Sequence, residues 1–398
     1  MKARRKASAA PRRQVASAPG SEGPAVVELI AAQQGEVTYP IHVGPGADAA
    51  LPALCEGADQ VALVTCKRVL ATPLGARVLA QLQATAPLAV VHLLPDGEKG
   101  KTLAELERAA VALLEAGCTR RSLVVGLGGG AVTDAAGFLA ATFMRGVPWI
   151  AVPTTLLAMV DAAIGGKTAA NLPVAKNAVG AFHPPRAVLA DPDALLTLPA
   201  RELSSGKGEV VKYGALDASL LSHFAEACAG TRIDPAVIAA CARMKVDVVR
   251  EDPNEHGPRK LLNLGHTYGH GVEAAGRFKR FTHGEAVAVG LAFAFRLARR
   301  LGRVGDAAVA TVEAALARAG LPVRVPAALA RDAVHHMAFD KKRTAAGLRW
   351  VLPRAEGGGW VVEWDVQAGD EAVAETVDEI AAGAGTPRRR TRSAKGKR

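Results

Sequence analysis

The sequence contains few aromatic residues and no long apolar run. Phe, Trp and Tyr together make up 4% of its 398 residues. The longest apolar stretches, at 147–160 and 286–295, are interrupted by Pro153 or end at Arg296. Both are shorter than the roughly 18–20 residues that a membrane-spanning helix needs. We therefore expect no membrane span, and because no secretory apolar segment follows Met1, we expect a cytoplasmic protein. An organelle transit peptide is the alternative, because the start of the sequence carries Arg and Ser and lacks acids.

Cysteine is also scarce. The five cysteines stand at positions 55, 66, 118, 228 and 241, and no CxxC pair occurs among them. Their odd number and wide spacing argue against a disulfide framework and against a thiolate zinc knuckle. We expect buried free thiols in a reducing compartment.

Acidic residues are missing from both ends of the chain. Residues 2–13 carry six basic residues and residues 388–398 carry seven, so these thirteen charges exceed the formal net charge of +11. The body between them is near neutral, with a net charge of −2. The small and polar composition of the ends predicts disordered basic tails over 1–25 and 385–398. We expect these tails to be solvated and to have no specific nucleic-acid partner.

What the sequence does contain is an alternation of short apolar runs with helical patterns, followed by long helical segments. This order predicts an α/β domain with a mostly parallel sheet at 26–198 and a mainly helical domain at 199–384, with a small late hairpin. A cleft between two such domains is a common place for an active site. The expected strands are 61–65, 88–94, 122–127 and 150–152; the expected helices are 103–116, 236–250, 261–276, 284–301 and 307–319; the hairpin strands are 348–352 and 360–364.

Two glycine-containing segments fit an anionic ligand. Residues 122–134 read as a strand that runs through three glycines into a helix, where backbone N–H groups and the helix dipole favour a phosphate. The spacing is not that of the GxGxxG fingerprint, and a tight strand–helix turn remains the alternative. The segment 161–168 ends like a P-loop, but Asp161 occupies the position of the first glycine, so we reject a nucleotide P-loop. A loop carrying Lys167, with Lys176 and Asn177 nearby, still suits an anion, although a solvated loop is also possible.

Three histidines form the strongest chemical signal. His266 and His270 lie four residues apart in a helical pattern and therefore share a face, and His283 begins the next helix. Two histidines and one carboxylate are a common catalytic zinc set that leaves one position open. Glu209 is a candidate third ligand. Packing or capping roles for the histidines remain the alternative on spacing alone.

Eight strings of this sequence resemble, in order, those of the 3-dehydroquinate synthase family. They extend from about Tyr39 to Trp364 and cover most of the chain without its tails. The strings are 95–101, 128–134, 141–146, 152–156, 165–168, 203–214, 261–270 and 283–288.

The resemblance implies a Rossmann-like NAD-binding domain followed by a helical domain that carries one divalent metal, zinc or cobalt. It implies that 3-deoxy-D-arabino-heptulosonate 7-phosphate is converted to 3-dehydroquinate and phosphate. The route would be transient oxidation by NAD, phosphate elimination, re-reduction and aldol closure, so that the cofactor is regenerated in each turnover. The family pattern assigns the metal to Glu209, His266 and His283.

The resemblance also implies roles for further residues. Lys167 and Asn177 would hold the substrate phosphate, with His270 as a proton-transfer group, and Arg145 would be lent to the partner across a homodimer interface. Further substrate-binding positions are Lys212, Lys245, Arg259, Asn263 and Lys341. The positions that match NAD contacts are Asp96, Glu98, Lys101, Gly129, Gly130, Asp134, Thr154, Thr155, Thr197 and Leu198, together with Asp161, Lys167 and Lys176.

The chain departs from the family pattern at several positions. Cys66 replaces the Asp or Asn that binds a cofactor ribose, Lys207 precedes Glu209 in an unusual Gly-Lys-Gly string, and Pro253 replaces a common acid. A thiol is a weak hydrogen-bond partner, so we expect a weaker or displaced NAD contact at Cys66.

Three other readings compete with the resemblance. A sister sugar-phosphate cyclase would share the fold, NAD and metal, but Arg259, Asn263 and His270 are of the dehydroquinate type. A metal-dependent polyol dehydrogenase would not need cations for a phosphate and a carboxylate. An RNA-binding protein on an inactive scaffold would not need the intact ligand set.

Overall fold

The computed structural model describes residues 27–337, 343–344 and 347–382. Its first half is built on a seven-stranded sheet of order β1-β2-β9-β6-β5-β3-β4, in which only β1 runs antiparallel to its neighbour. The central strands are apolar on both faces, which suits a parallel sheet covered on both sides. The strands are β1 (Glu28–Gln34), β2 (Val37–Val43), β3 (Val61–Cys66), β4 (Leu88–Leu94), β5 (Leu123–Gly128), β6 (Trp149–Pro153) and β9 (Ala187–Ala190).

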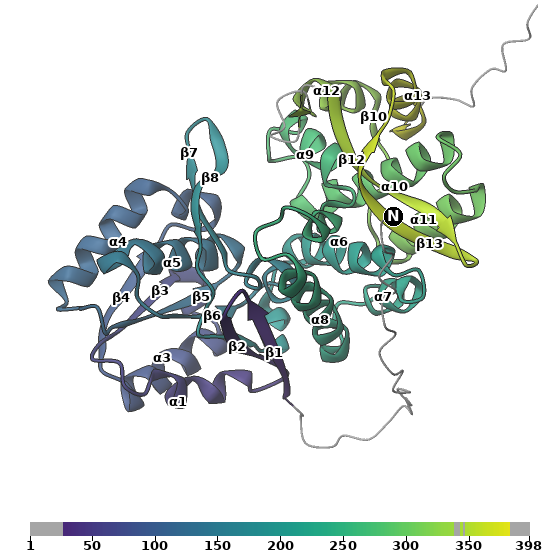
Figure 1. Cartoon of the computed structure of the whole chain (residues 1–398). Coiled ribbons are helices and arrows are strands. Elements are labelled where there is room, and N and C mark those ends of the chain that lie inside the picture. Colours follow the sequence, from purple (N-terminus) through teal and green to yellow (C-terminus); the bar gives the residue numbers. More distant parts are fainter. Residues whose placement is uncertain (1–26, 338–342, 345–346, 383–398) are drawn as a thin grey trace, which may run out of the picture.

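Helices flank this sheet, and a separate hairpin stands beside it. The hairpin packs on α5 and rises from the α/β elements in Figure 1. The helices of this half are α1 (Leu51–Cys55), α2 (Lys67–Leu70), α3 (Pro73–Thr85), α4 (Leu103–Glu115) and α5 (Gly130–Thr142), with short turns η1 (Ala47–Ala50), η2 (Gly97–Gly100), η3 (Phe143–Arg145), η4 (Ala158–Ala162) and η5 (Pro192–Thr197); the hairpin consists of β7 (Lys167–Leu172) and β8 (Ala175–Phe182).

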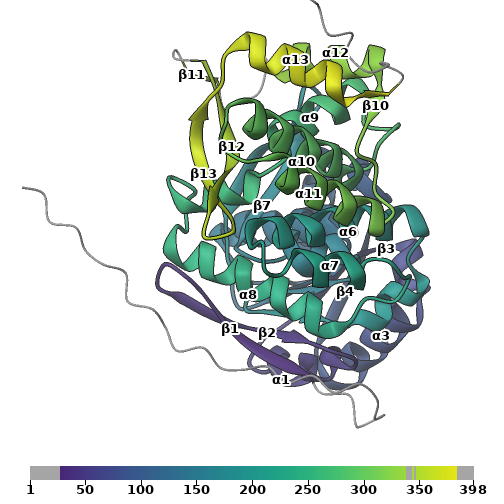
Figure 2. The same ribbon diagram turned by 90° about the vertical axis from the view of Figure 1, so that its right-hand side faces the viewer.

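The second half is mainly helical and lies on the other side of Figure 1; Figure 2 shows it from the front. Helix α10 is its centre, because residues on all of its faces are buried and it contacts α6, α9, α11 and α13. The helices are α6 (Ala200–Leu216), α7 (Leu221–Ala227), α8 (Pro235–Glu251), η6 (Pro258–Asn263), α9 (His266–Ala275), α10 (His283–Arg300), α11 (Asp306–Arg318), α12 (Ala327–Met337) and α13 (Asp370–Ile380); the strands are β10 (Val325–Pro326), β11 (Arg343–Thr344), β12 (Gly347–Glu356), β13 (Gly359–Gln367) and β14 (Ala381–Ala382).

This architecture confirms the expected fold class. The predicted strands, the late hairpin and most of the predicted helices occur within a residue or a few of their expected bounds. All five cysteines are buried and free. None of the described helices combines the length and the apolarity that crossing a bilayer requires.

Two expectations were wrong in detail. The single helix expected at 261–276 is divided into η6 and α9, because Gly265 adopts a left-handed φ of 79° between them. The segment around Lys167, expected as a loop, is the start of strand β7. Its hairpin partner β8 was not expected at all. The tails and Lys341 lie outside the described residues.

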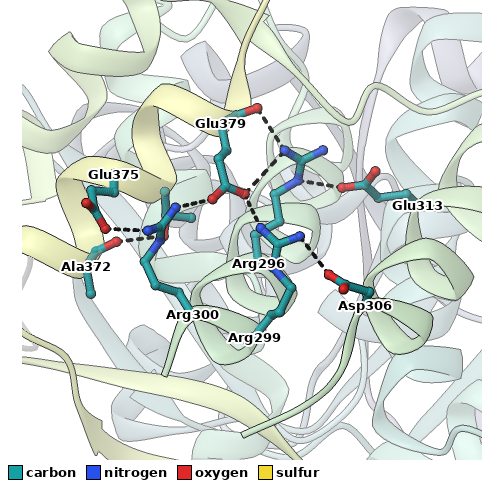
Figure 3. A network of polar contacts seen from close by, with 9 residues as sticks. Arg296, Arg299, Arg300, Asp306, Glu313, Ala372, Glu375 and Glu379 are labelled. Atoms are coloured by element: carbon teal, nitrogen blue, oxygen red, sulfur yellow. Dashed lines mark hydrogen bonds and ion pairs between the residues drawn. The ribbon is translucent and has the colours of Figure 1, made fainter. Parts of the chain in front are cut away.

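A network of arginines on α10 attaches the last helix to the helical half (Figure 3). Arg296 is buried; its Nε donates to Glu313 on α11 at 2.6 Å and its Nη1 donates to the carbonyl of Glu379 on α13 at 2.8 Å. Arg299 donates to the Glu379 carboxylate at 2.6 Å, and Arg300 pairs with both Glu375 and Glu379. Because Arg296 joins three helices and is shielded from water, its contacts count for more than an exposed pair.

Replacing Arg296 should therefore destabilise this half. We expect Arg296→Ala to lower the free energy of unfolding by about 2 kcal/mol, because a partly buried carbonyl and a partly buried carboxylate lose their donor. Arg318→Ala is the matched control, since its pair with Glu226 is largely exposed and should contribute less than about 1 kcal/mol. Urea unfolding followed by circular dichroism would compare them. Equal shifts in the two variants would contradict this assignment.

Candidate active site

Glu209, His266 and His283 meet at the contact between α6, α9 and α10. The Nε2 atoms of His266 and His283 lie 3.5 and 3.3 Å from Oε1 of Glu209. Their ligand atoms all lie within 4.8 Å of one another. The approach depends on two glycines, because a Cβ on Gly208 would lie 2.2 Å from the carbonyl oxygen of Gly284. Helix α6 can therefore approach the start of α10 closely enough to set Glu209 beside His283.

The chemistry of this group fits a divalent metal ion. Glu209 is fully buried, and neither of its carboxylate oxygens has a hydrogen-bond partner among the described residues, although Lys212 forms an ion pair with it. A buried carboxylate without hydrogen bonds is costly unless a cation neutralises it. One carboxylate and two imidazoles are a common catalytic set for zinc.

Contacts at Nδ1 of each ring orient both imidazoles toward Glu209. The Nδ1 atom of His283 lies 2.9 Å from Oε2 of Glu273, and Nδ1 of His266 lies 3.2 Å from the carbonyl oxygen of Leu264. With Nδ1 occupied, each ring presents Nε2 to the position between the three side chains. A carboxylate or carbonyl behind the ring is the usual support for a histidine that binds a metal.

The two imidazoles differ in protonation. Burial lowers the pKa of His266 well below its usual range, so this ring is neutral and its Nε2 is a ready ligand. Burial also opposes a charge on His283, but the carboxylates of Glu209 and Glu273 outweigh it and raise its pKa to about 10. A metal ion at this position would displace that proton.

A chain of alternating charges extends from this group into the α/β half. The buried ammonium of Lys212 lies between Glu209 and Asp161, 3.9 Å from the latter, and Lys245 lies 2.6 Å from the same Asp161 oxygen. Tyr213 donates to Asp161 at 2.8 Å. Burial opposes ionisation of Asp161, yet Lys245 and Lys212 hold its pKa far below its usual range. Burial lowers the pKa of Lys245 to about 8, partly offset by Asp161.

One cleft of about 1790 Å³ brings most of the predicted positions together. The glycine turn connects a strand to a helix as expected, since β5 ends at Gly128 and α5 begins at Gly130. Gly130 lines the cleft. A Cβ on Gly129 would lie 2.8 Å from Thr155, so a larger residue would not fit the turn. The predicted residues that line the cleft are Glu98, Lys101, Gly130, Asp134, Thr155, Asp161, Lys167, Lys176, Asn177, Lys245, Asn263, His270 and His283.

The β7–β8 hairpin ties the predicted cofactor and phosphate positions together. Lys101 pairs with Asp134 on α5 and donates to Oδ1 of Asn177 on β8 at 2.5 Å. Asn171 on β7 donates to Glu98 at 2.5 Å and accepts from the backbone of Asn177 at 2.9 Å. The strands thus carry residues distant in sequence to the end of α5.

Glu255 joins Lys167 to the helical half. Its carboxylate pairs with Lys167 and accepts from the Asn263 amide at 2.8 Å. Lys176, on the other strand of the hairpin, lies 4.1 Å from the centroid of the Phe278 ring. Both halves of the chain therefore contribute to this end of the cleft.

Some predicted residues lie outside the cleft wall. Arg259 is 1% exposed and donates to the carbonyls of Gly165 and Pro253. Arg145 is exposed at the end of α5 opposite the glycine turn. Glu209, Lys212 and His266 are buried beside the cleft, and the remaining NAD-type positions lie at turns around the sheet: Asp96, Gly129, Thr154, Thr197 and Leu198.

The departures from the family pattern are accommodated differently. Cys66 is buried at the end of β3 beside Asp96, and burial raises its pKa, so the thiol stays neutral. Lys207 is half-buried near Cys228 on the α6 surface, and burial lowers its pKa. Its side chain does not pair with Glu209 in the described structure.

Four polar residues of the site were not predicted from the sequence. Glu273 lies seven residues after His266 on α9, so helical spacing could have found it. Tyr213 follows the predicted Lys212. No local pattern marks Glu255 or Asn171, because their partners are distant in sequence.

Comparisons with known proteins identify the family of the chain. The family model described as 3-dehydroquinate synthase N-terminal matches residues 91–205, and the one described as 3-dehydroquinate synthase C-terminal matches residues 206–343. Together they match more than half of the chain.

Solved structures of sugar-phosphate cyclases have the same fold. A 2-deoxy-scyllo-inosose synthase complexed with carbaglucose-6-phosphate, NAD+ and Co2+ matches with a TM-score of 0.77 and 24% identity, over 88% of this chain and 100% of that one. The 2-epi-5-epi-valiolone synthase from Streptomyces hygroscopicus subsp. jinggangensis, with NAD+ and Zn2+ bound, matches with a TM-score of 0.73 and 27% identity, over 87% and 98%. Glycerol dehydrogenase from Schizosaccharomyces pombe matches with a TM-score of 0.60 at 15% identity, over 84% and 86%. With both family models matched in consecutive order, the chain belongs to the 3-dehydroquinate synthase-like superfamily of sugar-phosphate cyclases.

Proposed function

We propose that this cyclase is a 3-dehydroquinate synthase, which converts 3-deoxy-D-arabino-heptulosonate 7-phosphate to 3-dehydroquinate and phosphate in the shikimate pathway. The observation that carries the proposal is the series of ion pairs that runs from Glu209 through Lys212 and Asp161 to Lys245. It connects a two-histidine, one-carboxylate group to the cleft that also contains the glycine turn. One bound substrate would therefore contact both a metal and a dinucleotide.

The cofactors of the proposal are NAD and one divalent metal, zinc or cobalt. The two cyclases above have NAD+ bound together with Co2+ or Zn2+. Glu209, His266 and His283 would hold the metal. The glycine turn with Lys101, Asp134 and the other NAD-type positions would hold the dinucleotide.

The charges around the cleft favour a substrate with two anionic ends. Lys167 and Asn177 lie on the hairpin, where they would bind a phosphate, whereas Lys245 and Asn263 come from the helical half. The heptulosonate carries a carboxylate as well as a phosphate, whereas glucose 6-phosphate and sedoheptulose 7-phosphate carry only the phosphate. This difference favours the dehydroquinate reaction over those of the sister cyclases.

The mechanism divides the work between the bound groups and the protein. When bound, NAD would accept and return a hydride while the metal lowers the pKa of the substrate hydroxyl that is oxidised. Lys245 would orient the substrate beside Asp161, Lys212 would hold Asp161 and Glu209 from behind the cleft wall, and Lys167 would neutralise the phosphate as it leaves. His270 lines the cleft beside His266, with ring centroids 5.4 Å apart, and would move the proton. The overall reaction is redox-neutral.

A homodimer is part of the proposal. Arg145 is exposed at the far end of α5 from the glycine turn, so it would act on the cleft of a partner. A cytoplasmic location, the lack of a specific nucleic-acid partner and the domain boundaries 26–198 and 199–384 stay predictions.

Phosphate release tests the function directly. With NAD and zinc, we expect release from the heptulosonate 7-phosphate, formation of dehydroquinate and no net NADH, and we expect a chelator to abolish turnover. Sedoheptulose 7-phosphate, glucose 6-phosphate and glycerol serve as comparison substrates. Faster turnover of either sugar phosphate would indicate a sister cyclase, and net NADH from glycerol would indicate a polyol dehydrogenase.

The contact between Glu273 and Nδ1 of His283 should strengthen metal binding, and the metal affinity should show this. We expect Glu273→Gln to weaken zinc binding about 10- to 100-fold, because the orienting carboxylate behind the ligand is lost. A competition titration with a chromophoric chelator gives the affinity without any turnover. His270→Ala is the control and should bind zinc as the unmodified chain does. An equal loss in His270→Ala would instead place the metal between His270, Glu273 and His283.

Lys245 should set the alkaline limit of substrate capture. Its pKa of about 8 means that its ammonium loses the proton as pH rises through 8, so kcat/KM for the anionic substrate should fall there. Lys245→Arg keeps a cation and should move the fall to higher pH. Lys245→Met should lower kcat/KM and remove its fall above pH 8 from the pH profile. An unchanged fall in Lys245→Met would assign it to another group.

A further inference from the structure

The Gly165–Gly166 turn that leads into Lys167 is held by contacts from three segments. Gly165 and Gly166 adopt left-handed φ values of 88° and 61°, and the next residue begins β7. A Cβ on Gly165 would lie 2.8 Å from Val249 and 2.9 Å from Arg259, and one on Gly166 would lie 2.4 Å from Gln34. At either position, a residue with a side chain would have a strained backbone and would collide with its neighbours.

Both polar groups of Gly165 are bound by buried side chains from opposite halves of the chain. The hydroxyl oxygen of Tyr39, on β2, accepts from the Gly165 N–H at 3.0 Å, and Arg259, on η6, donates to the Gly165 carbonyl at 2.9 Å. Tyr39 is 2% exposed and Arg259 is 1% exposed. Buried polar groups specify a conformation strongly, because breaking one contact leaves its partner unsatisfied.

Lys167 extends from this turn toward the substrate end of the cleft. Its ammonium pairs with Glu255, which also accepts from Asn263. Arg259 and Asn263 both belong to η6. This short helix therefore contacts the turn before Lys167 through Arg259 and the Lys167–Glu255 ion pair through Asn263. A shift of the Gly165 peptide would move Lys167 relative to this arrangement.

We propose that Tyr39 is a positioning residue for the cyclase reaction, which acts through the Gly165 peptide to set Lys167 against the substrate phosphate. It would not touch the substrate. Arg259 holds the same peptide from the opposite side. The proposal rests on the proposed function for the identity of the phosphate, but the contact between Tyr39 and Gly165 does not.

A double-mutant cycle tests the proposal. We expect Tyr39→Phe to raise KM for the heptulosonate 7-phosphate about tenfold, the equivalent of one hydrogen bond, with a smaller change in kcat. In a Lys167→Met background the same substitution should have no further effect on KM, because the group it positions is gone. Equal effects in the two backgrounds, or none in either, would overturn the proposal.

Thr376→Val is the matched control. It also removes a fully buried hydroxyl, which donates to the Ala372 carbonyl at 2.7 Å on α13, far from the turn in sequence and outside the cleft lining. Its effect on KM should be absent in both backgrounds. A Thr376→Val effect equal to that of Tyr39→Phe would reduce the role of Tyr39 to general stability and overturn the proposal.

A second readout separates this proposal from the proposed function. If the unmodified chain turns over no sugar phosphate, the function fails, and hydrogen exchange of the peptide covering 165–168 then tests the contact alone. Faster exchange there in Tyr39→Phe than in Thr376→Val would show that the Tyr39 hydroxyl stabilises the turn. Unchanged exchange would contradict it.

Discussion

The site depends on one buried carboxylate. Glu209 lies among packed helices with its oxygens unsatisfied by hydrogen bonds among the described residues, facing two imidazoles and one ammonium. Such a group is tolerated in a protein interior only when cations neutralise it. The Gly208–Gly284 approach, the Glu273 contact behind His283 and the Lys212–Asp161 chain can all be understood as the means of placing those cations.

Both halves of the chain contribute residues to the cleft. The sheet contributes the glycine turn, and the hairpin contributes Lys167 and Asn177. The helical half contributes Lys245, Asn263 and His270. In the proposed reaction, hydride transfer, elimination and cyclisation would all act on one small molecule, so the groups that serve them would have to converge within a few ångströms. Such a reaction would need the halves to meet, and the partly buried pair Lys245–Asp161 joins them.

Much of the fold was predictable because its signals are local. Apolar runs between turn residues marked β3, β4, β5 and β6, and helical periodicity marked α8, α10 and α11. The β7–β8 hairpin was not predicted, because its alternating pattern is weak and it packs on α5, which is distant from β8 in sequence. The break before α9 depends on one left-handed glycine inside a helical pattern.

The site was predictable to a similar depth. His266 and His283 stood out by spacing, and Glu209 was chosen by resemblance. Glu255 and Tyr39 had no such signal, because each acts on a partner more than 80 residues away in sequence, Lys167 and Gly165 respectively. Residues of this kind emerge only when the chain is folded.

X-ray absorption spectroscopy of the zinc-loaded protein tests the central claim most directly. The number of imidazoles in the first coordination shell can be counted at Zn–N distances of about 2.0–2.1 Å. The account predicts two imidazoles in the unmodified chain, two in His270→Ala and one in His266→Ala. One imidazole in His270→Ala and two in His266→Ala would contradict it, because the metal would then lie outside the Glu209 group.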